Sequence, residues 1–188
     1  MKPLSIRLCG YGGQGIILSA IILGETAVTK QGLYAVQTQS YGSEARGGQC
    51  QSELIISDTP IRTPIQEKND ILVALFQTAF RSYVPGLKKD GLLIVDSELV
   101  PDLSGVGSEV SIYKIPATEI AIGLGNKMAA NMVVLGYLQA KTNLFTKEHL
   151  LDVVRDTVKP RFWDLNKRAV EAGVQFALDP EDKADETL

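Results

Sequence analysis

A chain of 188 residues, 45% hydrophobic and 22% charged, has the size and composition of one globular domain. Its formal net charge of −3 argues against a broad nucleic-acid-binding face, and its two cysteines and one histidine are too few for a zinc site or an iron–sulfur cluster. The sparse cysteines favour a reducing, cytoplasmic setting, and we expect neither a signal peptide nor a membrane span, because the longest apolar stretch covers only residues 16–23.

Strands and helices alternate in the first half of the chain. A buried strand is predicted at residues 4–9, a densely apolar helix at 16–31 and a second strand at 33–38, which together have the size of a βαβ unit. The tetrapeptide KKDG, at residues 88–91, predicts a turn. Further strands are predicted at 49–57, 70–76, 92–96 and 110–115, with a helix at 78–87.

The last third of the chain is helical by pattern. An almost wholly apolar helix is predicted at 126–141, a helix capped by Thr146 follows, and an apolar stripe runs over 162–176. We therefore expect an α/β, Rossmann-like fold with a mainly parallel sheet, helices on both faces and C-terminal helices. We expect residues 1–178 to form the single domain and residues 179–188 to form a mobile acidic tail.

A glycine-rich turn, CGYGGQGII, joins the first predicted strand to the first predicted helix. Gly10, Gly12 and Gly15 have the spacing that lets a backbone approach a ligand and lets a helix pack against a strand. The helix N-terminus then offers free N–H groups to an anion. A nicotinamide or flavin dinucleotide is disfavoured, because the second strand ends in Thr38 and Gln39, without the ribose-binding acid expected about 20 residues on. No Gly-Lys-Ser/Thr follows, which excludes a P-loop.

A second glycine-rich stretch, SYGSEARGGQ, follows the second predicted strand. Ligands of open α/β sheets collect outside the carboxyl ends of the strands, so both loops are expected to face one crevice. Arg46 has two equally supported interpretations on spacing alone: it contacts a phosphate, or it pairs with Glu44 inside a surface loop.

Together the two motifs resemble the gamma subunit of 2-oxoacid:ferredoxin oxidoreductases, most of all the 2-oxoglutarate type. The segments NDILVALFQTAF, GLLIVDSELV and NKMAANMVVLG extend the resemblance over residues 5–175. It implies an enzyme subunit, inactive alone, that helps to bind coenzyme A in a complex forming acyl-CoA, carbon dioxide and reduced ferredoxin from a 2-oxoacid. Thiamine diphosphate and iron–sulfur clusters then belong to alpha, beta and possibly delta partner subunits.

The resemblance assigns binding roles. The sequence shows no nucleophile–base pair and too few cysteines and histidines for a metal site, so we expect no catalytic and no metal-binding residue in this chain. Ser43 stands where family members often have proline. Asn126 is expected to cap a helix, while Asn131 is either a ligand contact or a satisfied buried amide. The candidate coenzyme A residues are Gly10, Gly12, Gly13, Gln14, Gly15, Ser43, Glu44, Arg46, Gly47 and Asn131.

Three alternatives stay open at this point. The chain is a subunit of an indolepyruvate oxidoreductase, which shares the first motif. It is a free-standing nucleotide-binding protein, which needs a ribose contact that the sequence does not offer. Or it is an assembly module whose glycine turns serve packing alone.

Overall fold

The computed structural model describes residues 2–41, 48–180 and 182. Six strands form one sheet: β1 (Leu4–Tyr11), β2 (Tyr34–Tyr41), β3 (Gln49–Ser57), β4 (Asn69–Ala74), β5 (Leu87–Asp96) and β6 (Ser111–Ile115). The α-helices are α1 (Ile16–Gln31), α2 (Gln77–Tyr83), α3 (Ala117–Gly123), α4 (Ala130–Thr142), α5 (Lys147–Thr157) and α6 (Trp163–Ala177). Short 3-10 turns, η1 to η3, occupy Val84–Gly86, Lys127–Ala129 and Pro160–Phe162.

The sheet has the strand order β2-β3-β1-β4-β5-β6. β1, β4, β5 and β6 are parallel neighbours, whereas β3 runs antiparallel to both β1 and β2. The predicted α/β class is confirmed, and the sheet is mixed. β1 and β2 run in the same direction, as a βαβ unit requires, but β3 lies between them.

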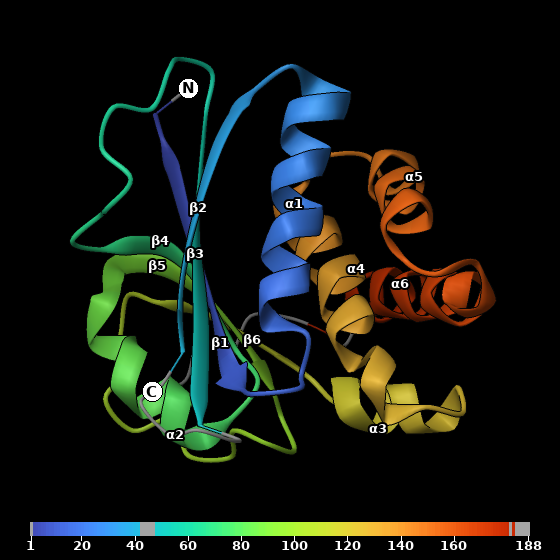
Figure 1. Cartoon of the computed structure of the whole chain (residues 1–188). Coiled ribbons are helices and arrows are strands. Elements are labelled where there is room, and N and C mark those ends of the chain that lie inside the picture. Colours follow the sequence, from blue (N-terminus) through green and yellow to red (C-terminus); the bar gives the residue numbers. More distant parts are fainter. Residues whose placement is uncertain (1, 42–47, 181, 183–188) are drawn as a thin grey trace.

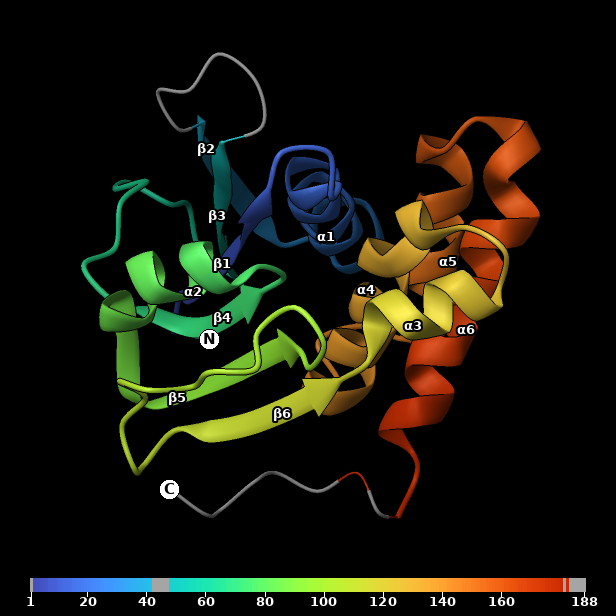
Figure 2. The same cartoon turned by 90° about the horizontal axis from the view of Figure 1, so that it is seen from below.

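Helices cover both faces of this sheet (Figures 1 and 2). α1, α4, α5 and α6 lie on one side and α2 lies on the other. β1 therefore leads to a helix on one face, and its parallel neighbour β4 leads to a helix on the opposite face. Such a switch point opens a crevice at the carboxyl ends of the two strands, where open α/β sheets bind ligands. Within the described residues, no helix is long and apolar enough to cross a membrane.

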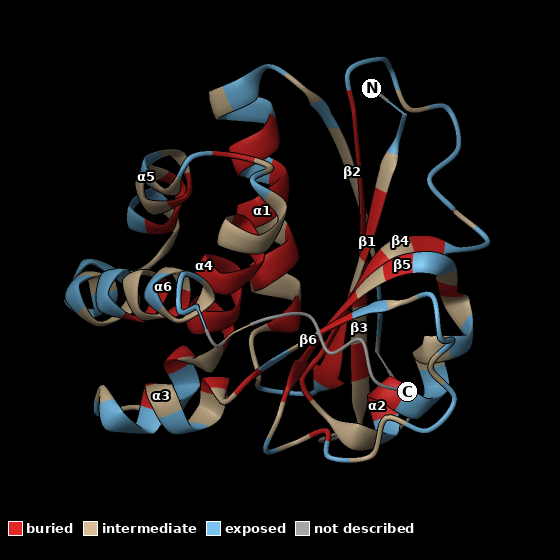
Figure 3. Ribbon diagram, turned by 180° about the vertical axis from the view of Figure 1, so that it is seen from behind, coloured by how far each residue is buried: buried red, intermediate tan, exposed pale blue. Residues whose placement is uncertain are grey.

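The main core lies between the sheet, α1 and α4, and the surface of α4 is buried almost all round (Figure 3). α4 and α6 cross at two glycines. A Cβ atom at Gly136 would lie 2.0 Å from the Val170 carbonyl oxygen, and one at Gly173 would lie 1.9 Å from that of Val133. The two backbones touch at this crossing, so neither glycine position has room for a side chain.

The C-terminal segment returns to α4 at Asp182. The Tyr137 hydroxyl donates to the Asp182 carboxylate at 2.9 Å, and the Lys141 ammonium lies 2.9 Å from its other oxygen. Lys141 also donates to the Ala177 carbonyl at 3.0 Å. Asp182 falls within the predicted tail, of which residue 181 and residues 183–188 lie outside the described residues.

Both cysteines are buried, as expected. Burial raises the pKa of the Cys9 thiol and, by the same cause, that of Cys50. A raised pKa lowers the thiolate fraction, and the thiolate is the reactive form. We expect neither cysteine to react with Ellman's reagent at pH 8 in the native protein, and both to react in guanidinium chloride. Rapid labelling of one thiol in the folded chain would contradict this.

Candidate functional site

The glycine turn joins β1 to α1, and it lies at the switch point between β1 and β4. Gly13 has φ +97° and Gly15, the N-cap of α1, has φ +73°, both in the left-handed region that favours glycine. No side chain caps α1, and its first turn holds no acidic residue. The N–H groups of this turn have no intrahelical partners and are therefore available to an anion.

Gln14 holds the turn in shape. Its Oε1 accepts from the Tyr11 N–H at 2.6 Å, and its Nε2 donates to the Leu75 carbonyl, just beyond β4, at 2.8 Å. A Cβ atom at Gly10 would lie 2.5 Å from Gln14 Oε1, so the first glycine makes room for this side chain. The amide of Gln14 thus ties β1 to β4. A direct ligand contact by Gln14 stays a prediction.

The two sequence motifs meet where β1 pairs with β3, with Tyr11 opposite Gln49. The Gly12 N–H donates to the Gly48 carbonyl at 3.1 Å, which places the end of the second motif against the first. Gln14 N–H donates to the Tyr11 carbonyl, while no partner is found for the Gly13 N–H among the described residues. The N–H groups of Gly13 and of the first turn of α1 are therefore the ones left free for a ligand. Four candidate residues lie outside the described residues: Ser43, Glu44, Arg46 and Gly47.

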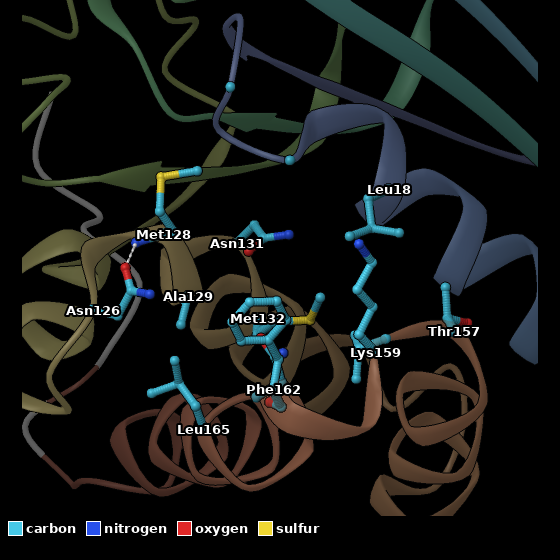
Figure 4. A pocket seen from close by; sticks show the side chains of 14 residues that line it. Leu18, Asn126, Met128, Ala129, Asn131, Met132, Thr157, Lys159, Phe162 and Leu165 are labelled. Carbon is cyan, nitrogen blue, oxygen red and sulfur yellow. Dashed lines mark hydrogen bonds between the residues drawn. The ribbon is translucent and has the colours of Figure 1, made fainter.

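Two pockets flank the turn and share Gly13 and Met128. The first, here called the helix pocket, has a volume of about 470 Å³ and lies between α1, α4 and the start of α6 (Figure 4). Its apolar wall includes Leu18, Met132, Phe162 and Leu165. The second, here called the strand pocket, has a volume of about 330 Å³ and lies at the ends of β1, β4 and β5.

Asn131 forms the polar floor of the helix pocket. It is 4% exposed, and its Nδ2 donates to Ser19 Oγ at 3.4 Å, which in turn donates to the Gly15 carbonyl at 3.0 Å. No partner is found for its Oδ1 within the described residues, and the side chain lines the pocket. A Cβ atom at Gly15 would lie 2.5 Å from Asn131 Nδ2, so this glycine is required by contact as well as by φ.

Asp96 lines the strand pocket and ends β5. Its Oδ2 accepts from the N–H and the hydroxyl of Thr118 at 2.9 and 2.6 Å, and its Oδ1 accepts from the Glu98 N–H at 3.1 Å. These bonds fix the start of α3 against the strand end. Asn126 Oδ1 accepts from the Met128 N–H at 3.0 Å, which confirms the predicted cap.

Two lysines that the sequence reasoning missed stand beside the turn. Exposed Lys159 lines the helix pocket and extends toward Leu18 (Figure 4), and exposed Lys127 lines the strand pocket. Neither pairs with a carboxylate in the part of the chain that the structure describes. No sequence motif distinguishes these lysines from other surface lysines, because only the folded positions of η2 and η3 bring them to the pockets.

Comparison with known proteins identifies the family of this chain. The pattern of the pyruvate ferredoxin/flavodoxin oxidoreductase family matches residues 5–176. The chain belongs to this family. Its resemblance to the 2-oxoglutarate type is also supported: the 2-oxoglutarate synthase subunit KorC of Methanocaldococcus jannaschii is 43% identical over 92% of both chains. The indolepyruvate alternative is less supported, since subunit IorB of Archaeoglobus fulgidus is 28% identical.

Solved structures of this oxidoreductase family share the fold. The gamma subunit of a keto/oxoacid ferredoxin oxidoreductase from Geobacter sulfurreducens matches with a TM-score of 0.85 and 38% identity, over 95% of this chain and 98% of that one. The 2-oxoglutarate:ferredoxin oxidoreductase of Magnetococcus marinus, solved with 2-oxoglutarate, coenzyme A and succinyl-CoA, matches with a TM-score of 0.83. At 24% identity, over 98% of this chain and 33% of that one, it supports the fold alone.

Proposed function

We propose that the chain is the gamma subunit of a multi-subunit oxidoreductase that converts 2-oxoglutarate, coenzyme A and oxidised ferredoxin to succinyl-CoA, carbon dioxide and reduced ferredoxin. The observation that carries the proposal is the 43% identity to a 2-oxoglutarate synthase subunit over 92% of both chains. Alpha, beta and possibly delta subunits are the proposed partners. We assign iron–sulfur clusters to them, because two buried cysteines cannot supply the thiolates of a cluster. The resemblance to the oxidoreductase family is the ground for assigning thiamine diphosphate to them as well.

The cleft around the glycine turn is the proposed coenzyme A site. The ligand combines a diphosphate with a flat aromatic base and a long flexible arm, and the cleft combines an uncapped helix N-terminus with apolar walls. A Cβ atom at Gly13 would meet no protein atom within 4 Å, so space for a ligand lies directly above the turn. Buried Asn131 presents an amide oxygen that can accept from a ligand N–H.

Each part of the chain then has a task in binding. The first turn of α1 and Gly13 hold the diphosphate, Lys127 and Lys159 neutralise it, and the apolar wall excludes water. Coenzyme A supplies the thiol that accepts the acyl group. The proposed role of this subunit is to bind and orient that thiol carrier for chemistry on a partner.

Replacing Lys159 by methionine is expected to weaken coenzyme A binding about tenfold, since it removes one charge-assisted contact. Because Lys159 is exposed and has no carboxylate partner among the described residues, stability is expected to change by less than about 0.5 kcal/mol. Isothermal calorimetry on the assembled enzyme measures the affinity. Lys167→Met is the matched control, because Lys167 is an exposed lysine of α6, away from both pockets, that pairs with Glu171. Equal loss in both variants would refute the assignment.

Reconstitution tests the function itself. The chain alone is expected to be inactive, and combination with the alpha and beta subunits to give reduction of ferredoxin or methyl viologen that requires both 2-oxoglutarate and coenzyme A. Saturable micromolar binding of NAD, NADP or FAD to the isolated chain, with no activity on reconstitution, would instead support the free-standing nucleotide-binding alternative.

A further inference from the structure

The outer strand β2 is an unprotected edge of the sheet. Within the described residues it pairs with β3 alone, along Tyr34–Tyr41. Its sequence, YAVQTQSY, contains no charged residue and no proline. Sheet edges are ordinarily guarded by charges, prolines or short length, because an open ladder of N–H and C=O groups pairs with other chains. The opposite edge, β6, has only five residues and carries Lys114.

A groove runs beside this edge on the side of α1. It has a volume of about 320 Å³, and Val28 at its rim is 46% exposed. Glu25 is the only charged side chain among its lining residues. Gly24 lets α1 lie close to the sheet, since a Cβ there would be 3.2 Å from Leu54 Cδ1. The small and apolar lining residues are Ala20, Ile21, Gly24, Val28, Ala35 and Leu54.

An open strand edge beside a groove formed with a helix is the arrangement that binds an extended segment by strand addition: the ladder gives main-chain affinity, and the groove takes alternate side chains. We propose that an uncharged, extended segment of a partner subunit adds to the sheet beside β2 and inserts apolar side chains into this groove. The inference rests on the proposed function, because the segment belongs to one of the proposed partners.

A second copy of this chain fits the groove less well. Ala35 and Gln37 line the groove, so alternate residues of β2 point to the α1 side. Two copies joined edge to edge about a two-fold axis would keep that side in common and bring the exposed Gln39 of each copy beside the groove of the other. Amide side chains there would lose water without gaining apolar contact.

The test uses the full chain, tagged and co-expressed with the alpha and beta subunits. Val28→Glu places a charge at the groove rim, at a position that is already 46% exposed. We expect it to reduce co-purification of the partner subunits about tenfold, because the charge must be desolvated in the complex. Ile122→Glu, at a 58% exposed position on α3, is the matched control and is expected to retain them. Thermal melting of the isolated variants verifies that both are folded.

Hydrogen–deuterium exchange supplies a second readout, since strand addition is expected to slow exchange along residues 34–41 in the complex relative to the isolated chain. Full co-purification of Val28→Glu with unchanged exchange in β2 would overturn the inference alone. Absence of partner subunits from the wild-type preparation would overturn the proposed function and the inference together. A dimer of the isolated chain that Val28→Glu dissociates would assign the edge to a second copy and overturn the partner proposal.

Discussion

Gly173→Ala is expected to lower the free energy of unfolding by about 3 kcal/mol, at the upper end of the cost of overpacking. The added Cβ atom would lie 1.9 Å from the Val133 carbonyl oxygen and 2.9 Å from the Tyr137 nitrogen. Both are backbone atoms of α4, so relief requires the helices to separate along the core that they share. For a chain of this length, the melting temperature should fall by about 6–12 °C. Chemical denaturation and calorimetry measure the two quantities.

Gly123→Ala is the matched control for this helix crossing. Gly123 ends α3, its φ is outside the left-handed region, and a Cβ atom there would meet nothing within 4 Å. Alanine at this position is expected to be neutral or to stabilise by up to about 1 kcal/mol, because it restricts the unfolded chain. Similar losses in both variants would show that loss of glycine as such, and not the close contact of α4 with α6, determines the effect.

The sequence predicted correctly the features that depend on neighbouring residues, namely one turn and two helix caps. The position of the turn between β1 and α1, the N-cap at Thr146 and the cap at Asn126 each depend on residues within a few positions of each other, and the structure confirms them. The structure also adds to the interpretation of Gln14, which distinguished this turn from a dinucleotide fingerprint. Its amide accepts from the nearby Tyr11 N–H and donates to the carbonyl of Leu75, which lies 61 positions beyond Gln14 in the chain.

Strand order was beyond what periodicity could predict. The insertion of β3 between β1 and β2 depends on pairing between distant segments, which hydrophobic pattern does not specify. The turn predicted at residues 88–91 was wrong, because these residues belong to β5. The polar pattern there has a different cause: Asn69 pairs with Leu87 and Ile71 with Leu92, so the strand bulges between them.

The two glycines where α4 crosses α6 also could not be interpreted from the sequence alone, because their role depends on a contact between distant segments. Gly136 and Gly173 lower the helical propensity of their segments and carry no local signal for a crossing. The need for glycine at these two positions becomes evident only in the folded chain, where the backbones of α4 and α6 touch. Lys127 and Lys159 are alike in this respect, since only the folded chain brings them to the two pockets beside Gly13.

Glu53→Gln is expected to lower the free energy of unfolding by about 3 kcal/mol, since it leaves the Arg7 cation without its counter-charge. Arg7 on β1 stands opposite Glu53 on β3, and Arg7 Nη2 donates to the Glu53 carboxylate. The two side chains are only 15% and 10% exposed, so water cannot replace the lost partner. The Tyr83 ring, 5.1 Å from the guanidinium, supplies a weaker contact that remains. Urea denaturation at neutral pH measures the change.

An exposed ion pair provides the control for this buried one. Lys167 and Glu171 are one helical turn apart on α6, at 3.9 Å and more than 40% exposed, so Glu171→Gln is expected to cost less than about 0.5 kcal/mol. Replacing both buried partners, as Arg7→Met with Glu53→Leu, is expected to recover most of the stability lost in Glu53→Gln, because an apolar pair leaves no buried charge unpaired. A double variant as unstable as Glu53→Gln would show that the pair is needed to set the register of β1 on β3, and that its charges are worth more than their desolvation costs.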